Sequence, residues 1–191
     1  IMDLTPFDET VLIDSDYLIL DGSLDMVWGS KEHLMCNKKL MNLHHDAWIE
    51  RFNPMGIPVY WATAMYIRKD ERNTILFDHM QFVLENYHYY MDLYGFNPNA
   101  YPRNDYALSI SLHLMNGMIE QDQVKPLPTD YILMGDEMDD LHGMDDAGLI
   151  VTSERDQGNH QLHRVTRNIH VMNKKAVLRN MEGLISYATT S

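Results

Sequence analysis

The sequence predicts one α/β domain over residues 1–191, with a mixed central sheet and flanking helices. With 191 residues, of which 45% are apolar, the chain can bury one sizeable core. Short runs of β-branched and aromatic residues, which are typical of strands, are interspersed with segments whose apolar residues recur at helical spacing.

An acidic pair separates two apolar runs near the start of the chain. Residues 11–13 predict a buried strand, Asp14 and Asp16 follow it, and residues 17–20 are apolar again. Because an unpaired carboxylate is expensive to desolvate, one at the end of a buried strand is usually paired or binds a cation. Mg²⁺, Mn²⁺ and Ca²⁺ suit such oxygens, and ligands gather at the carboxyl ends of strands. The alternative is an ordinary turn in which Asp caps the next segment.

The first half of the chain continues with one strand and one long helix. Residues 24–48 have no clean period and predict a short helix or two at most, and we interpret the polar residues 44–46 as surface residues rather than ligands. Residues 59–67 predict a second buried strand. Residues 71–94 predict a helix that ends at Gly95. We interpret the tyrosines of this helix as core or interface residues rather than as a stacking platform.

A second, largely buried helix is predicted over 106–117. Asn104 or Asp105 suits its N-cap, and Gly117 suits its end. Arg103 and Asp105 then lie at the mouth of the core. Either they form a structural cap and ion pair, or the carboxylate faces a ligand.

The last third of the chain predicts three strands and a helix. The strands are expected at 131–135, 149–152 and 164–172, and an amphipathic helix at 176–188. Residues 136–146 are rich in carboxylates but lack the residue order of a helix-loop-helix calcium site, so we expect a solvated acidic loop.

Composition excludes several classes of function. A net charge of −13, from 28 acidic and 15 basic residues, argues against extended nucleic-acid binding, which needs clustered Lys and Arg. The single cysteine, Cys36, excludes an intramolecular disulfide and predicts a buried small side chain in a reducing compartment. No apolar run approaches the length of about 18 residues that spans a membrane. We therefore expect a cytoplasmic protein without a membrane span.

Four features together resemble the nucleotide-sugar-dependent glycosyltransferases of the glycosyltransferase-A fold, in particular the family 8 type. They are a strand ending in Asp14-x-Asp16, small residues within Trp61–Met65, the pair Asn104–Asp105 opening a buried helix, and His170-x-x-x-Lys174. The chain is also similar to uncharacterised glycosyltransferase-like proteins of tailed bacteriophages, which would place it in the host cytoplasm. The resemblance extends from Thr10 to Lys174.

The resemblance implies a metal site and a donor site. The family's acidic metal-binding motif matches Asp14 and Asp16, and the histidine that completes its divalent site matches His170. The lysine that contacts the donor diphosphate matches Lys174. Asn173 replaces the glycine that usually precedes this lysine, and because Asn tolerates a positive φ, we expect the tight turn to survive. The implied cofactors are Mn²⁺ or Mg²⁺ and a nucleotide-sugar donor, with Mn²⁺ favoured by the mixed carboxylate and imidazole ligands.

The implied activity is a metal-dependent and retaining transfer of a sugar from a UDP-sugar to an acceptor that the sequence does not identify. Asp105 matches the catalytic acidic residue near the sugar and the acceptor. The metal, Lys174 and either Arg164 or Arg167 would neutralise the leaving diphosphate. Two alternatives stay open: a metal-dependent phospho- or nucleotidyltransferase, and a non-catalytic structural or interaction protein that binds partners through its tyrosine-rich helix.

The amino terminus departs from the family. Such folds place two or three βαβ units of about 30 residues each before the acidic motif, whereas 13 residues precede Asp14. Either part of the N-terminal nucleotide-binding half is missing, or the base pocket is reduced or supplied by a partner chain, as in a homo-oligomer.

Overall fold

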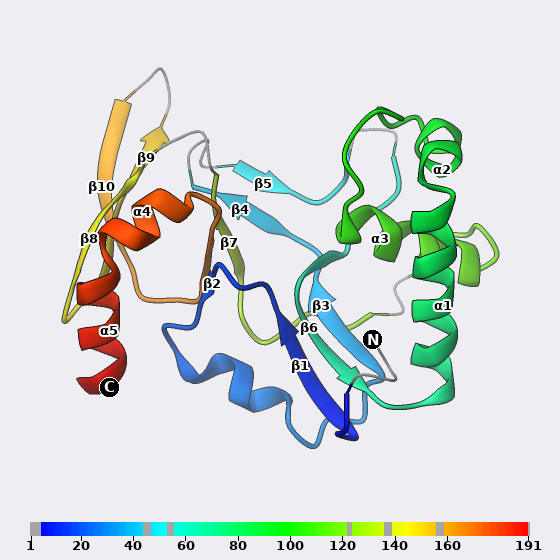
Figure 1. Ribbon diagram of the computed structural model, residues 1–191, viewed down its shortest axis with the longest axis horizontal. Helices are drawn as coiled ribbons and strands as arrows, with labels where there is room; N and C mark the ends of the chain where they lie inside the picture. The colour runs from blue at the N-terminus through cyan, green and yellow to red at the C-terminus, as the bar shows by residue number, and fades with distance from the viewer. Residues whose placement is uncertain are drawn as a thin grey trace. The chain divides into compact units, whose positions relative to one another are not determined.

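The computed structural model describes residues 5–43, 47–52, 56–121, 124–135, 139–155 and 159–190, which form an α/β fold with mixed sheets and helices (Figure 1). The chain divides into two compact units. Unit 1 comprises residues 1–13, 27–39 and 50–128, and unit 2 comprises 14–26, 40–49 and 129–191. The interpretation of 1–191 as one domain stays a prediction, and the polar cluster at 44–46 lies outside the described residues.

Unit 1 contains an antiparallel three-stranded sheet in the order β1-β6-β3, formed by Glu9–Ile13, Trp61–Arg68 and Leu34–Asn37. The central strand β6 is buried at every residue except Arg68, which confirms the predicted second strand. Strand β1 was expected to be buried. That expectation was wrong, because β1 is an edge strand and its residues are only partly covered.

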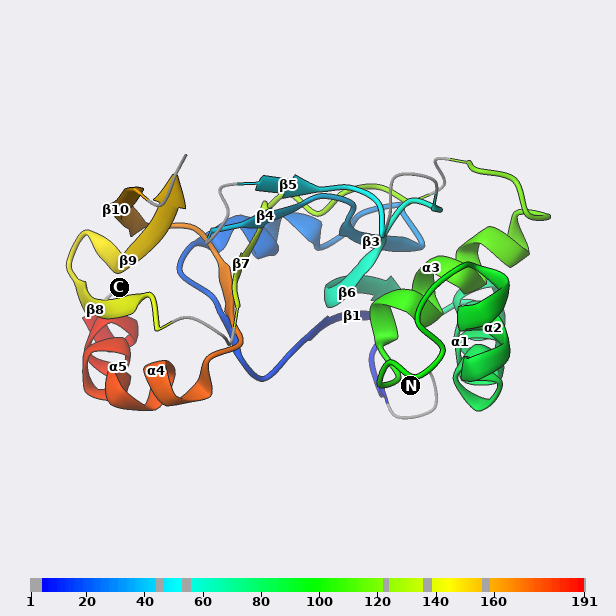
Figure 2. The ribbon, with the colours of Figure 1, turned by 90° about the horizontal axis from the view of Figure 1, so that it is seen from above.

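The helices of unit 1 pack on one another and on the sheet. They are α1 at Glu71–Glu85, α2 at Tyr87–Leu93 and α3 at Asn104–Met115. Helix α3 contacts both α1 and β6, and the two helices lie side by side in both views (Figures 1 and 2). The residues buried in this core come from all these elements, and Cys36 among them is fully buried, as predicted.

The single helix predicted over residues 71–94 is interrupted at Asn86. The side-chain amide of Asn86 donates to the Phe82 carbonyl at 2.9 Å, and the Asn86 backbone leaves the helical region with φ −113° and ψ 31°. A side chain that bonds a carbonyl of the preceding turn competes with helix propagation. Gly95 follows α2 with φ 70°, which confirms the predicted end.

Helix α3 agrees with the sequence in its burial and differs at its start. Residues Ala107–Leu112 are all buried, and Gly117 beyond its end has φ 69°. The N-cap is Arg103, whose side chain does not cap the helix, and the prediction of Asn104 or Asp105 as N-cap was wrong. The Asp105 side chain is instead engaged with strand β6, as described below.

The N-cap of α1 provides a test of the fold. Asp70 accepts from the Asn73 backbone amide at 2.9 Å and lies 2.5 Å from His33 Nδ1. Burial raises the pKa of Asp70, but the bonds from His33 and Asn73 outweigh it and hold the pKa below its ordinary value. The stability that the carboxylate contributes is therefore present above the unfolded pKa, about 3.9, and is lost as the pH falls through the lower folded value.

We expect Asp70→Ala to lower the free energy of unfolding by about 1 kcal/mol at pH 7, the usual loss for an N-cap. The difference from wild type should shrink as the pH falls below 4. Urea unfolding at a series of pH values measures both. A difference that stays constant down to pH 2 would contradict the assignment.

Unit 2 contains a five-stranded sheet in the order β2-β11-β7-β4-β5. Its strands are Tyr17–Leu18, Ile169–Val171, Tyr131–Met134, Leu40–Asn42 and Ala47–Ile49. Strands β11, β7 and β4 run parallel, and the two outer strands run antiparallel to their neighbours. This is the mixed sheet that the sequence predicted.

A second sheet of unit 2 is antiparallel, in the order β10-β9-β8. Its strands are Asn159–Val165, Gly148–Arg155 and Leu141–Asp145. The helices α4 at Lys174–Arg179 and α5 at Met181–Thr190 contact β8 (Figures 1 and 2). Apolar residues of both sheets and of α4 form one buried cluster.

Several predicted elements of the second half are divided differently. The strand expected at 164–172 is two strands, β10 and β11, separated by a turn in which Asn168 is fully buried. The helix expected at 176–188 is two helices that meet at Asn180. Part of the acidic segment 136–146 is the strand β8 rather than a loop, and residues 136–138 lie outside the described ranges.

The early segment 24–48 also differs, because it forms strands β3, β4 and β5 after the 3-10 helix at Gly22–Val27. Strands of only three or four residues are too short to leave a clear periodic signal, which explains why a short helix or two was expected there.

Candidate metal centre

The acidic pair lies in the turn between β1 and β2. The Tyr17 amide donates to the Asp14 carbonyl at 3.1 Å, which closes the turn, and the Val171 amide donates to the Asp16 carbonyl at 2.9 Å. The second bond ties the turn to strand β11. The position of Asp16 is therefore set by a residue far away in sequence.

His170 lies in the middle of β11, between Tyr17 on the antiparallel side and Leu133 on the parallel side. Its Nε2 is 3.0 Å from Asp16 Oδ1, and its Nδ1 shares a hydrogen bond of 2.8 Å with the Tyr131 hydroxyl. The rings of Tyr131 and His170 are stacked with centroids 6.0 Å apart. Both nitrogens of the imidazole are thus oriented by partners from β7 and from the acidic turn.

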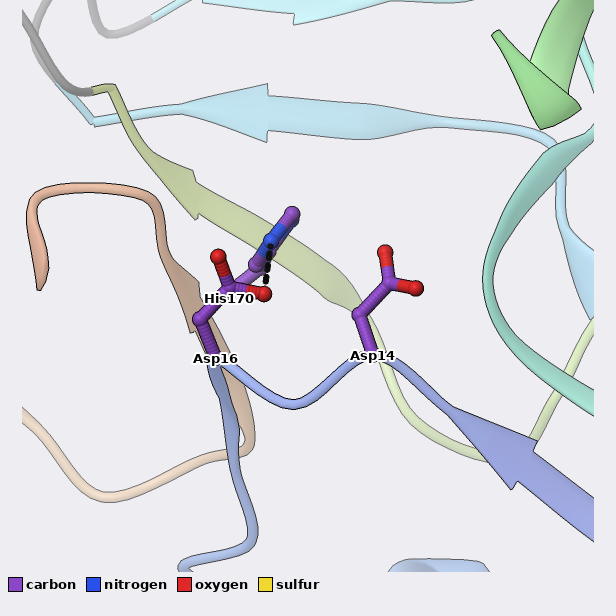
Figure 3. A group of neighbouring side chains, drawn as sticks. All are labelled: Asp14, Asp16 and His170. Carbon is purple, nitrogen blue, oxygen red and sulfur yellow. Dashed lines mark hydrogen bonds and ion pairs between the residues drawn. The ribbon is translucent and has the colours of Figure 1, made fainter.

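These residues form a cluster of possible metal ligands. One ligand atom each from Asp14, Asp16 and His170 lies within 4.8 Å of the others, and Figure 3 shows the two carboxylates and the imidazole on neighbouring segments. His170 is 8% exposed, whereas Asp14 is an exposed residue. The cluster therefore has a buried side and a side open to solvent.

Lys174 lies next to the cluster, and Asn173 has a structural role. Lys174 Nζ is 3.9 Å from Asp16 Oδ2, and its side chain is 72% exposed. Asn173 caps α4 by accepting from the Ala176 amide at 3.0 Å, and its φ is −74°. The expectation of a positive-φ turn at Asn173 was therefore wrong, because the residue serves as a helix N-cap, for which Asn is well suited.

The two arginines considered for the diphosphate have other partners in unit 2. Arg164 donates to Asp145 through Nε and Nη2, with the shorter contact at 2.7 Å. Arg167 pairs with Asp130. Neither pairing supports the predicted contact of an arginine with the donor.

Asp105 belongs to unit 1, and both of its carboxylate oxygens are engaged there. Oδ1 accepts from the Ala62 amide of β6 at 2.8 Å, and Oδ2 pairs with Arg103 Nη2 at 2.8 Å. Its side chain is 13% exposed. Of the two alternatives raised by the sequence, these contacts support the structural ion pair. The catalytic role of Asp105 stays a prediction of the resemblance.

The chemistry of the cluster fits a divalent cation. Two carboxylates and one imidazole are ligands that Mn²⁺ accepts readily, and Mg²⁺ less so because it prefers oxygen. Three protein ligands leave coordination positions for other oxygens. To bind a metal, His170 must present an unprotonated Nε2, and its Nδ1–H would then donate to the Tyr131 hydroxyl. The Tyr131 hydroxyl can accept a hydrogen bond from Nδ1–H or donate one to an unprotonated Nδ1, so it can pair with either tautomer of His170.

Sequence reasoning did not assign a role to Tyr131 or Asn168. Tyr131 was predicted only as a strand residue, and its contact with His170 depends on the pairing of β7 with β11. The Asn168 side chain accepts from the backbone amides of Leu20 and Asp21, at 2.7 and 3.1 Å, and so anchors the segment that follows β2. The position of an asparagine two residues before His170 was the only feature of the sequence that could have indicated the role of Asn168.

Comparison with protein family models, with curated proteins and with solved structures finds no match to this chain. Membership of a glycosyltransferase family therefore stays a prediction that rests on the motif residues. Within the described ranges, no helix combines the length and the apolar character that a bilayer crossing requires.

We expect Tyr131→Phe to weaken the binding of Mn²⁺ about tenfold, because removing the partner of a ligating histidine typically reduces metal affinity by about 10- to 100-fold. Tyr131 is 3% exposed, so circular dichroism should first confirm that the variant is folded. Tyr89→Phe removes an exposed hydroxyl in unit 1 and serves as the control. Equal Mn²⁺ affinity in Tyr131→Phe and wild type would rule out this role.

Proposed function

We propose that the chain is a metal-dependent glycosyltransferase that binds a nucleotide-sugar donor, a UDP-sugar, at the cluster of Asp14, Asp16 and His170. The observation that supports it most is the convergence of these three ligand atoms within 4.8 Å from segments more than 150 residues apart. The proposal includes a fold of the glycosyltransferase-A type, of which the α/β architecture and the mixed sheet are the observed part.

The carboxylates of Asp14 and Asp16 and the imidazole of His170 would hold the divalent cation. When bound, the cation supplies positive charge to a diphosphate, and this charge matters most as the glycosidic bond breaks and the leaving group becomes more negative. A chain with a net charge of −13 would otherwise repel such a group. Asp14, Asp16 and His170 are thus the metal ligands in this proposal.

Lys174 supplies a second positive charge. Its Nζ is near Asp16, and its exposed side chain can reach a diphosphate on the open side of the cluster. Asn173 contributes by starting α4 at Lys174, which fixes the backbone from which the lysine extends. We assign no chemical role to Asp105, because its carboxylate contacts the Ala62 amide and Arg103 as a structural ion pair does.

A product assay with Mn²⁺ and a panel of UDP-sugars tests the proposal. We expect release of UDP together with free or transferred sugar, and loss of this release in Asp14→Ala/Asp16→Ala. Asp139→Ala, which removes an exposed carboxylate paired with Arg179, is the matched control. Release of pyrophosphate, or phosphoryl transfer without sugar transfer, would favour a phospho- or nucleotidyltransferase. No turnover of any donor by the wild type would favour a non-catalytic interaction protein.

A further inference from the structure

Unit 1 contains a cavity of about 270 Å³ that is lined by charged side chains from three segments. Lys38 and Lys39 follow strand β3, Arg51 comes from the segment before β6, and Glu120 comes from the segment after α3. Small-molecule sites usually range from about 300 to 1,000 Å³. The cavity is therefore of a size for a single-ring ligand and too small for a whole nucleotide sugar.

Two ion pairs cross the lining of the cavity. Lys39 Nζ is 2.6 Å from Glu50 Oε1, and Arg51 Nη2 is 2.6 Å from Glu120 Oε1. All four side chains are at least 40% exposed, and such exposed pairs contribute little to stability. They do present donors and acceptors side by side, an arrangement that matches the hydroxyl groups of a sugar or polyol.

The guanidinium of Arg51 is held in place from two sides. Its Nη1 donates to the Gly56 carbonyl at 2.6 Å, in addition to the bond from Nη2 to Glu120. A guanidinium that is already oriented loses less conformational entropy when a ligand binds. Tyr60, whose hydroxyl donates to the Gln121 carbonyl at 3.3 Å, and Pro58 add apolar surface to the lining.

Positive charge predominates at the cavity, although the chain as a whole is acidic. Lys38, Lys39 and Arg51 face two carboxylates, Glu50 and Glu120. Burial lowers the pKa of Lys38 below its ordinary value, and the charge of the nearby Lys125 lowers it further. An oxyanion placed beside Lys38 would offset the repulsion between these two ammonium groups.

From this cavity we infer that unit 1 carries a binding site for a small hydroxylated oxyanion, a monosaccharide phosphate or a sugar acid. The oxyanion lies between Lys38 and Arg51, and the ligand hydroxyls bond to the two ion pairs. Because two cations flank the oxyanion, a phosphate dianion binds more tightly than a carboxylate. The inference uses no residue of the metal cluster and does not depend on the proposed function.

Calorimetry in EDTA with glucose 6-phosphate, glucuronate, glucose and inorganic phosphate tests the site. We expect glucose 6-phosphate to bind most tightly, followed by glucuronate, and both more tightly than glucose or inorganic phosphate. Arg51→Gln and Lys38→Gln should each weaken glucose 6-phosphate binding by about tenfold or more, the effect of losing a charge-assisted bond.

Two controls separate this inference from the proposed function. Arg164→Gln removes another exposed, carboxylate-paired arginine, in unit 2, and should bind glucose 6-phosphate like wild type, as should Asp14→Ala/Asp16→Ala. Circular dichroism confirms that each variant is folded. No binding of glucose 6-phosphate or glucuronate at millimolar concentration, no preference over inorganic phosphate, or unchanged affinity in both Arg51→Gln and Lys38→Gln would overturn the inference.

Discussion

Asp14→Ala/Asp16→Ala is expected to reduce Mn²⁺-dependent binding of UDP by at least about 100-fold, the largest functional effect we predict. The two substitutions remove both carboxylates of the cluster and leave His170 as the single ligand. Loss of one oriented partner already costs about 10- to 100-fold in metal affinity, so loss of two direct ligands should cost more. Calorimetry with UDP in the presence and absence of Mn²⁺ measures the change.

His170→Gln separates the metal role from a general loss of structure. The variant keeps a polar side chain near Tyr131 and removes the imidazole, so we expect weaker Mn²⁺-dependent UDP binding in a folded protein. Asp139→Ala is again the matched carboxylate control, since Asp139 pairs with Arg179 in the same unit. If Asp14→Ala/Asp16→Ala bound UDP as tightly as wild type does, Asp14 and Asp16 would not belong to the donor site.

Leu108→Ala is expected to have the largest effect on stability. Leu108 is fully buried in α3, within the core that joins the helices and the sheet of unit 1. Deleting a buried leucine side chain to alanine costs about 2–5 kcal/mol, through lost apolar transfer and the cavity left behind. Urea denaturation followed by far-ultraviolet circular dichroism measures the free energy of unfolding.

Leu93→Ala is the matched control for this prediction, because Leu93 also lies on a helix of unit 1 but is 52% exposed. We expect a change within about 0.5 kcal/mol, as is usual for a surface substitution. Equal losses of unfolding free energy in the two variants would show that burial does not determine how much Leu108 contributes to stability.

The elements that the sequence predicted well are those with a long apolar signal. Strand β6 is buried at every residue except Arg68, helix α3 is buried from Ala107 to Leu112, and both elements are rich in apolar residues. Two predicted helices were too long for a shared reason. Asn86 and Asn180 each donate from the side chain to the carbonyl four residues earlier, at 2.9 Å. The spacing of apolar residues along a helix does not show whether an asparagine makes this bond or extends into solvent.

The candidate site was predictable in part. The spacing of Asp14 and Asp16 and the resemblance around His170 identified the three residues that the fold brings together. The contribution of Tyr131 was not predictable, because it depends on which strands pair and in which register. The catalytic role of Asp105 was predicted from the resemblance alone. Its bond to the Ala62 amide of β6 is a tertiary contact that the sequence does not encode locally.

The proposed function requires that Asp14, Asp16 and His170 together bind a divalent cation. Electron paramagnetic resonance of Mn²⁺ titrated into the protein tests it most directly, because bound and free Mn²⁺ give different signals. We expect one bound Mn²⁺ per wild-type chain, and loss of that binding in both Asp14→Ala/Asp16→Ala and His170→Gln. A wild-type chain that binds no Mn²⁺, or variants that bind it as tightly as wild type, would show that these residues do not form a metal site.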